Sequence, residues 1–260
     1  MTDDGTATAP FEPRLALASL SGESDAAWAR GGLPHAGAAL LGGIALDRPT
    51  RDAARSLVAR DRTEFLPPDP LAFVDDQLGA LADAPLRPGV NVRATTPAPV
   101  ARAAAVCADH GAICEVNAHC RQAEMCDAGA GEALLRDGGR LAAMVAGAAD
   151  AGATVSVKVR TEVPDVDLPD LAARLDRAGA DLVHVDAMDS EGVVALVADA
   201  TDCAVIANNG VRDAATVREY LACGADAVSV GRPSDDPRVL ARVADALAAW
   251  FDADRRVARP

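Results

Sequence analysis

Ala151-Gly152-Ala153-Thr154-Val155-Ser156-Val157-Lys158-Val159-Arg160 is the stretch that decides the fold of this 260-residue chain. A helical run ends at its glycine, and valine then alternates with small or charged residues, as it does in a buried strand. The same glycine joint returns at Ala178-Gly179-Ala180 and at Cys223-Gly224-Ala225. Repeated joints of this kind are typical of proteins in which helices alternate with parallel strands.

Strand-like and helical runs alternate over most of the chain. The expected strands are Arg14–Leu20, Ala38–Ala45, Val90–Ala94, Ala112–Asn117, Thr154–Arg160, Asp181–Asp186, Ala204–Ala207 and Ala227–Val230. The expected helices are Arg51–Asp61, Pro70–Ala82, Pro99–His110, Gly138–Ala151, Leu168–Ala178, Ser190–Ala200, Ala214–Cys223 and Pro237–Phe251. This order predicts an α/β fold, a (β/α)8 TIM barrel over residues 13–252, with a disordered tail at 1–12 and a short tail at 253–260. An open doubly wound sheet is less favoured, because no GxGxxG motif follows the first strand.

The charge balance is strongly acidic, with 39 Asp and Glu against 25 Lys and Arg and a formal net charge of −14. A polyanion needs a basic surface, so this balance argues against a general nucleic-acid binder in ordinary salt. Acidic, lysine-poor proteins are typical of the cytosol of halophilic archaea, where molar salt screens the repulsion. A GC-rich genome would also deplete lysine, so both origins stay open.

The thiols and the hydropathy indicate the compartment. The six cysteines contain no CxxC pair, and no histidine lies at metal-ligand spacing from any of them. We therefore expect reduced thiols and no metal site. We find no secretory signal and no apolar run of about 18 residues. The sequence therefore predicts a cytoplasmic protein without a membrane partner.

Lys158 is the one lysine among the 25 cationic side chains, and it lies on the expected strand Thr154–Arg160. An ammonium group is a compact charge whose pKa moves on burial, whereas an arginine stays charged. A lone buried lysine is therefore a candidate for a ligand contact, a proton donor or an amine nucleophile. The alternative is a packing residue whose stem lies in the core.

Two glycine-containing turns follow the last two strands. Asn208-Asn209-Gly210 ends the seventh strand, and Gly231-Arg232 ends the eighth. In a TIM barrel these loops commonly bind phosphate, because backbone N–H groups and helix N-termini can approach it. Arg232 can add its guanidinium to the phosphate oxygens. Two ordinary strand-to-helix turns are the alternative.

Reactive side chains also end the fourth and sixth strands. Asn117, His119 and Cys120 end the fourth strand, and a thiol beside an imidazole can serve as a general acid. His184 and Asp186 are two residues apart, so they point to the same side of the sixth strand. These residues are expected either to contact a ligand or to pack in the loop and the core.

Several motifs, in the same order along the chain, resemble those of the dihydrouridine synthases. Glu115 to Leu135 is similar to that family's Asn-x-Gly-Cys-Pro strand, Gly-rich turn and Ala-x-Leu-Leu. Val157-Lys158-Val159-Arg160 resembles its Val-Lys-x-Arg strand, and Asn209-Gly210 and Gly231-Arg232 resemble its flavin-phosphate loops. The opening Ala-Pro-Met-Ala-Gly-x-Thr-Asp is similar to Ala18-Ser19-Leu20-Ser21-Gly22-Glu23-Ser24-Asp25.

That family is a flavin mononucleotide (FMN) barrel that reduces a uracil ring in tRNA. The resemblance implies that Lys158 and Asn91 contact the flavin ring, and that Cys120 gives a proton to the uracil carbon that the hydride does not reach. The other implied FMN contacts are Leu20 and Ser21 at the ring and Asn209, Gly210, Gly231 and Arg232 at the phosphate. The candidates for substrate contacts, or for support of them, are Asn117, His119, Arg160, His184 and Asp186.

The chain departs from the family pattern at four positions and at its end. His119-Cys120-Arg121 replaces Gly-Cys-Pro, which changes the shape and charge around the thiol. Asn91 stands in place of a glutamine, and Asp186 takes the place of a histidine by spacing. The sequence stops after the last barrel helix, as in a reduced archaeal side branch, so we expect no C-terminal helical tRNA-binding domain.

We therefore predict an FMN-dependent oxidoreductase that reduces a pyrimidine-like ring, of the dihydrouridine synthase or the dihydropyrimidine and dihydroorotate dehydrogenase type. The expected partners are a small pyrimidine-like substrate, or an RNA presented by another subunit, and a reduced nicotinamide cofactor as electron donor. The alternatives are a phosphate-binding lyase or aldolase that uses Lys158, and a non-catalytic barrel that binds FMN or a phosphorylated ligand.

Overall fold

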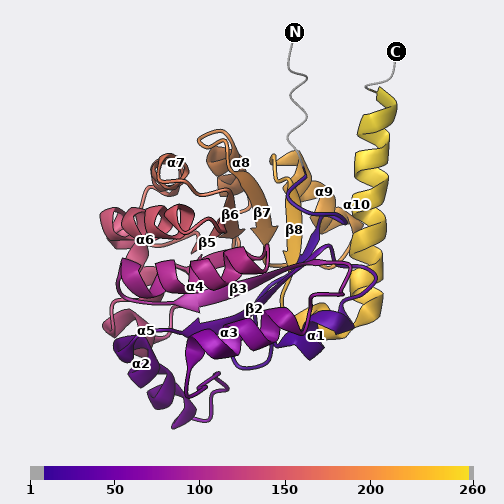
Figure 1. Cartoon of the computed structure of the whole chain (residues 1–260). Coiled ribbons are helices and arrows are strands. Elements are labelled where there is room, and N and C mark those ends of the chain that lie inside the picture. The colour runs from indigo at the N-terminus through magenta and orange to yellow at the C-terminus, as the bar shows by residue number, and fades with distance from the viewer. Residues whose placement is uncertain (1–8, 258–260) are drawn as a thin grey trace.

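Eight parallel strands close into a barrel in which each strand pairs with the next along the chain and β8 pairs with β1 (Figure 1). The computed structural model describes residues 9–257. The strands are β1 (Leu15–Leu17), β2 (Ala38–Ala45), β3 (Arg87–Arg93), β4 (Ile113–Asn117), β5 (Thr154–Arg160), β6 (Leu182–Asp186), β7 (Ala204–Asn208) and β8 (Ala227–Val230). The predicted TIM barrel is confirmed.

Helices cover the outside of the barrel, and the last of them runs along its side (Figure 1). They are α1 (Ala26–Gly31), α2 (Arg48–Val58), α3 (Pro70–Gly79), α4 (Pro97–Asp109), α5 (Ala123–Asp127), α6 (Gly138–Asp150), α7 (Leu168–Arg177), α8 (Gly192–Ala198), α9 (Ala214–Ala222) and α10 (Pro237–Val257), with the 3-10 turns η1 (Gly131–Arg136) and η2 (Arg232–Asp235). Asp47, Asp69 and Asp167 each accept a backbone hydrogen bond at the start of a helix that has proline in its first turn. Part of the acidic charge therefore stabilises helix N-termini.

Strand alternation separates the outer core from the barrel interior. Val155, Val157 and Val159 of β5 join the apolar cluster between the barrel and its helices, and the residues between them face inward. The floor of the interior is apolar and consists of Phe11, Ala16, Ala38, Leu40, Ile113, Leu182, Ile206 and Ala227. Further along the same strands the buried inward positions are polar, and they lead to the carboxyl ends of the strands.

The structure corrects both predicted tails. Phe11 is 6% exposed and Arg87 donates a hydrogen bond to the carbonyl of Pro10 (3.0 Å), so residues 9–12 pack under the barrel. The rest of the predicted disordered tail, residues 1–8, lies outside the described residues. α10 continues to Val257, so most of the predicted tail 253–260 is helical. Phe11 packs in the apolar floor of the barrel, which explains why this segment is held there.

The other differences concern element ends and short elements. β1 covers Leu15–Leu17 rather than Arg14–Leu20, and β3 begins at Arg87 rather than at Val90. α1, α5, η1 and η2 were not predicted, because a run of six residues or fewer shows no helical period.

The described residues 9–257 contain neither a membrane-spanning helix nor a clustered metal site. No helix in this part of the chain is both long and apolar enough to cross a bilayer. The same residues hold no group of three or more His, Cys, Asp or Glu side chains placed to bind a metal ion. The six cysteines are free thiols, and Cys107, Cys114 and Cys203 are buried.

Candidate active site

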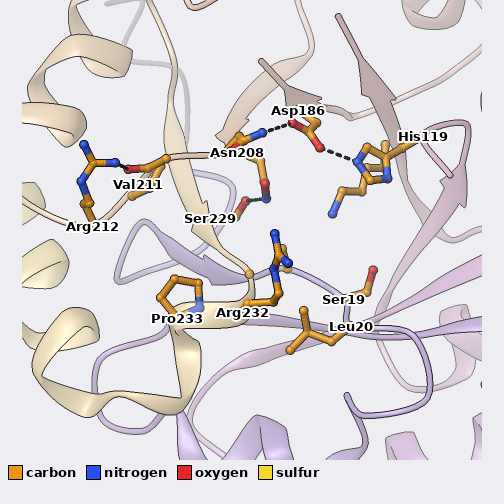
Figure 2. A pocket seen from close by; sticks show the side chains of 15 residues that line it. Ser19, Leu20, His119, Asp186, Asn208, Val211, Arg212, Ser229, Arg232 and Pro233 are labelled. Atoms are coloured by element: carbon orange, nitrogen blue, oxygen red, sulfur yellow. Dashed lines mark hydrogen bonds and ion pairs between the residues drawn. The ribbon is translucent and has the colours of Figure 1, made fainter. Parts of the chain in front are cut away.

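A hollow opens at the barrel mouth, where the carboxyl ends of the strands gather. It contains two adjoining cavities of about 370 and 400 Å³, a size that suits a small ligand. We call the first the glycine-loop cavity, since Gly210 and Gly231 line it, and the second the thiol cavity, since Cys120 lines it. Figure 2 shows His119 and Asp186 on one side of the glycine-loop cavity and Arg232 on another. Both cavities are lined by Ser19, His119, Lys158, Asp186, Asn209 and Arg232.

Glu115 of β4 is the centre of a buried polar network beneath the hollow. Its fully buried carboxyl accepts hydrogen bonds from Asn91 Nδ2 (2.7 Å) and Ser156 Oγ (3.1 Å), and it pairs with His184 Nδ1 (2.7 Å). Burial raises the pKa of Glu115, but His184, Lys158 and Asn91 outweigh burial and lower the pKa to about 2. Glu115 is therefore a carboxylate inside the barrel.

His184 of β6 carries the network to β7 and β8. Burial lowers the pKa of His184 despite the neighbouring Glu115, so the imidazole is neutral at pH 7. Its Nδ1–H donates to Glu115, and its Nε2 accepts from Ser229 Oγ (2.7 Å). Ser229 Oγ accepts in turn from Asn208 Nδ2 (2.8 Å). A network whose donors and acceptors match in this way holds its strands in one arrangement.

Asn91 of β3 carries the network in the other direction, to the loop after β4. Its Oδ1 accepts a hydrogen bond from Asn117 Nδ2 (2.8 Å). Asn117 Oδ1 accepts from the backbone N–H groups of Cys120 (2.9 Å) and His119 (3.2 Å). The buried carboxylate is thus connected to the thiol loop through two amide side chains.

Lys158 of β5 lines both cavities although it is only 4% exposed. Burial lowers the pKa of its ammonium group, while Glu115 and Asp186 raise it and favour the charged form. Among the described residues, Nζ has no hydrogen-bond partner. A buried amine beside two carboxylates and without a fixed partner is available to a ligand.

His119 and Asp186 connect the loops after β4 and β6. His119 Nε2 is hydrogen-bonded to Asp186 Oδ2. Asp186 Oδ1 accepts from Asn209 Nδ2 (2.9 Å) and from the backbone N–H of Met188 (3.3 Å). Burial raises the pKa of Asp186, but the bonds from His119 and Asn209 and the charge of Lys158 hold it well below its usual range. Asp186 is therefore ionised and accepts from three loops.

Two ion pairs frame the thiol cavity. Arg160 Nη1 lies 3.0 Å from Glu132 Oε2, and Arg93 Nη1 lies 2.6 Å from Glu64 Oε2. Arg93 also donates to Ser21 Oγ. The other cations that line this cavity are Arg62, Arg121, Lys158 and Arg232. The lining of this cavity thus has six cationic side chains and only two carboxylates, those of Glu64 and Asp186, although the chain as a whole has a net charge of −14. This local excess of positive charge suits an anionic ligand.

The loops after β7 and β8 form an open backbone cradle. Asn209 and Gly210 have φ values of 88° and 67°, and the Tyr220 hydroxyl donates to the Asn209 carbonyl (2.8 Å) and holds this turn. A Cβ added to Gly231 would meet no atom within 4 Å, so a ligand can approach its backbone. Arg232 follows at the start of η2 and reaches into the hollow (Figure 2). This donor set fits a phosphate group.

A known protein family matches the region of the chain that supplies most of these residues. Residues 83–256, more than half of the chain, match the family model described as dihydrouridine synthase. The chain belongs to the dihydrouridine synthase family. The predicted resemblance is confirmed, and β3 to β8 lie within the matched region of this dihydrouridine synthase family member.

Individual relatives of this dihydrouridine synthase family member agree with that result. A probable tRNA-dihydrouridine synthase of Rhodobacter capsulatus is 32% identical over 166 residues, which cover 58% of this chain and 51% of that protein. The chain therefore spans about half the length of this relative. An uncharacterized protein of Methanocaldococcus jannaschii is 25% identical over 233 residues, which cover 85% of this chain and 89% of that protein. The solved structure of morphinone reductase in complex with tetrahydroNAD is 15% identical with a TM-score of 0.62 and covers 89% of this chain and 87% of that one. At that identity it shows a shared fold alone.

The structure places most of the predicted site residues of this family member at the hollow. Those that line it are Leu20, Ser21, Asn117, His119, Cys120, Lys158, Arg160, Asp186, Asn209, Gly210, Gly231 and Arg232. Asn91 and His184 line neither cavity, and both are fully buried. The predicted contact of Asn91 with the flavin ring stays a prediction, and in the structure its amide bonds Glu115 and Asn117 inside the network. His184 occupies a supporting position.

Sequence reasoning did not identify three carboxylates of the site, those of Glu64, Glu115 and Glu132. Glu115 had a signal, because a carboxylate in the middle of a buried strand and in phase with Asn117 must face the barrel interior. Glu64 and Glu132 had no such signal in the sequence, since each reaches its ion-pair partner, Arg93 or Arg160, only when separate segments fold together.

Acid should destabilise this protein from about pH 6.5 downward. The pKa of His184 is lowered from 6.5, so below that value the unfolded chain binds a proton that the folded chain excludes. Glu115 adds a second loss between 4.5 and about 2, since its folded pKa is the lower one. We expect the Tm to fall steadily in thermal melts from neutral pH to about pH 4. A Tm that stays constant over this range would contradict the assigned network.

Proposed function

We propose that this chain is an oxidoreductase that binds FMN and reduces the carbon–carbon double bond of a uracil-type ring. One observation carries the proposal: a glycine cradle with Arg232 and a loop with Cys120 open onto adjoining cavities that share Lys158. Membership of the dihydrouridine synthase family supports the reaction class.

The residues of the glycine-loop cavity fit FMN. Gly210, Gly231 and Arg232 would hold the phosphate, because open backbone and a guanidinium suit phosphate oxygens. Leu20 supplies apolar surface for a flat ring, and Lys158 supplies a positive charge beside it. When bound, FMN supplies hydride chemistry.

Cys120 is the proton donor in this proposal. Its thiol is partly exposed and lines the cavity, and Asn117 fixes its backbone N–H. The thiol proton goes to the ring carbon beside the one that receives the hydride, so the double bond becomes a single bond. Lys158 and Arg160 stabilise the negative charge that develops on the ring carbonyl.

The cationic lining of the thiol cavity supports an anionic substrate. A small pyrimidine-like molecule that carries phosphate meets this requirement, and so does an RNA presented by another subunit. We propose a reduced nicotinamide cofactor as the electron donor that returns the flavin to its reduced state.

A second candidate function follows from the lowered pKa of Lys158. A buried amine of this kind is a nucleophile suited to a Schiff base in a lyase or aldolase. Borohydride trapping of a carbonyl ligand on Lys158, without any flavin requirement, would favour this function over the first.

Titration with FMN tests the proposal. The chain is purified in high-salt buffer, FMN is added, and the visible absorbance and the flavin fluorescence are recorded. We expect shifted flavin bands and quenched fluorescence at a one-to-one ratio. An unchanged spectrum with unquenched FMN would contradict the proposal.

Replacement of Lys158 by methionine should weaken FMN binding about ten- to a hundredfold, since a bond to a charged group is lost. Arg160→Lys should change it far less, because a cation remains beside Glu132. Dissociation constants from fluorescence titration compare the two variants. Equal and small effects would make Lys158 a packing residue.

A further inference from the structure

We propose that His119, oriented by Asp186, accepts the imide N–H of a uracil-type ring at its Nδ1 atom and thereby selects against cytosine-type rings. This inference deepens the proposed function and rests on it. It names a specificity-determining residue rather than a proton donor.

Asp186 fixes the tautomer of His119. The carboxylate of Asp186 is ionised and also accepts from Asn209 Nδ2, so it can only accept from the imidazole. Nε2 of His119 must therefore carry a proton toward Asp186. Burial lowers the pKa of His119 more strongly than Asp186 raises it, so the ring is neutral at pH 7. Nδ1 is left with a lone pair.

The Nδ1 atom of His119 is available to a ligand. The side chain is 32% exposed and lines both cavities. Among residues 9–257, no hydrogen-bond partner of Nδ1 is found. The backbone is not free to move away, because its N–H donates to Asn117 Oδ1 (3.2 Å). A fixed acceptor without a partner thus faces the hollow.

Three cationic donors line the thiol cavity together with this acceptor. Lys158, Arg160 and Arg121 line the same cavity, and none of them can accept a hydrogen bond in its charged form. The imide edge of uracil presents carbonyl, N–H and carbonyl in sequence, which complements donor, acceptor and donor. A cytosine ring presents a lone pair at the central position, which would face the lone pair of Nδ1.

Three nucleotides test this inference on the intact chain. The FMN-loaded protein is titrated with uridine 5′-monophosphate, its N3-methyl derivative and cytidine 5′-monophosphate, and binding is followed by the change in flavin absorbance. We expect the uridine nucleotide to bind roughly tenfold tighter or more than either of the others, because they leave Nδ1 unsatisfied. Equal affinities, or no binding of any of the three, would overturn the inference.

Variants separate selectivity from structure. His119→Ala should bring the affinity ratio of uridine to cytidine nucleotide close to one, and Asp186→Asn should lower it because an amide can bond either tautomer. A purely structural role would weaken both ligands equally and keep the ratio. His110→Ala is the matched control, since His110 Nε2 bonds Asp75 (2.7 Å) away from the hollow, and it should leave the ratio unchanged.

The same titration tests FMN binding separately from the role of His119. The flavin spectrum before any nucleotide is added reports FMN binding, and its absence would remove both proposals. Normal FMN binding with no preference among the nucleotides would remove the role of His119 alone.

Discussion

Cys120→Ala should leave FMN bound and lower the rate of ring reduction by about 100- to 10,000-fold. The thiol lines the thiol cavity and does not line the glycine-loop cavity, so its loss removes the proposed proton donor without disturbing the proposed phosphate cradle. Rapid mixing of the reduced, FMN-loaded variant with a uracil-containing ligand measures the rate of flavin reoxidation under anaerobic conditions.

Cys223→Ala is the control for that experiment. Cys223 is also a partly exposed free thiol, and it lies at the end of α9, away from both cavities. It should reoxidise like the unaltered protein. Loss of FMN binding in Cys120→Ala, or an unchanged rate of ring reduction, would contradict the role of the thiol as proton donor.

Glu115→Ala should lower the free energy of unfolding by about 3–5 kcal/mol, because three buried polar groups lose the carboxylate that they are bonded to. His184, Asn91 and Ser156 would each lose a hydrogen bond inside the barrel. Urea unfolding in high salt measures the change. The network also connects Glu115 to the loop of Cys120, so ring reduction should slow even where the variant is folded.

Asp52→Ala provides the comparison, since Asp52 forms exposed ion pairs with Arg55 and Arg48 on α2. Exposed ion pairs contribute little to the free energy of unfolding, so the unfolding curve of Asp52→Ala should almost overlay that of the unaltered protein. If Glu115→Ala were as stable as Asp52→Ala, the interior network would not be the structural centre that its burial indicates.

The barrel could be predicted because its signals are local. Valine alternation in Thr154–Arg160 and the glycine joints before three strands each depend on a few neighbouring residues. The inward side chains at the strand ends follow from the same alternation, which is why Lys158 and Asp186 were found as candidates. The confirmed fold places both at the mouth.

The contacts between loops could not be predicted. The bond from His119 to Asp186 joins positions 67 residues apart, and no local pattern shows that the imidazole reaches β6. Asn91 shows the same limit, because its place on β3 was foreseen and its hydrogen-bond partners were not. Its short amide is held by Glu115 and Asn117, so it supports the thiol loop from below the hollow.

The most direct test of the proposed reaction is a single turnover. The FMN-loaded chain is reduced with a nicotinamide cofactor or dithionite, freed of oxygen and mixed with uridine nucleotide or with tRNA. We predict that the flavin is reoxidised and that the uracil ring gains two hydrogens, one of them as a proton at the carbon that would lie beside Cys120, and that the mass of the nucleotide rises accordingly. A flavin that stays reduced, with both ligands unchanged in mass, would contradict the proposed reduction.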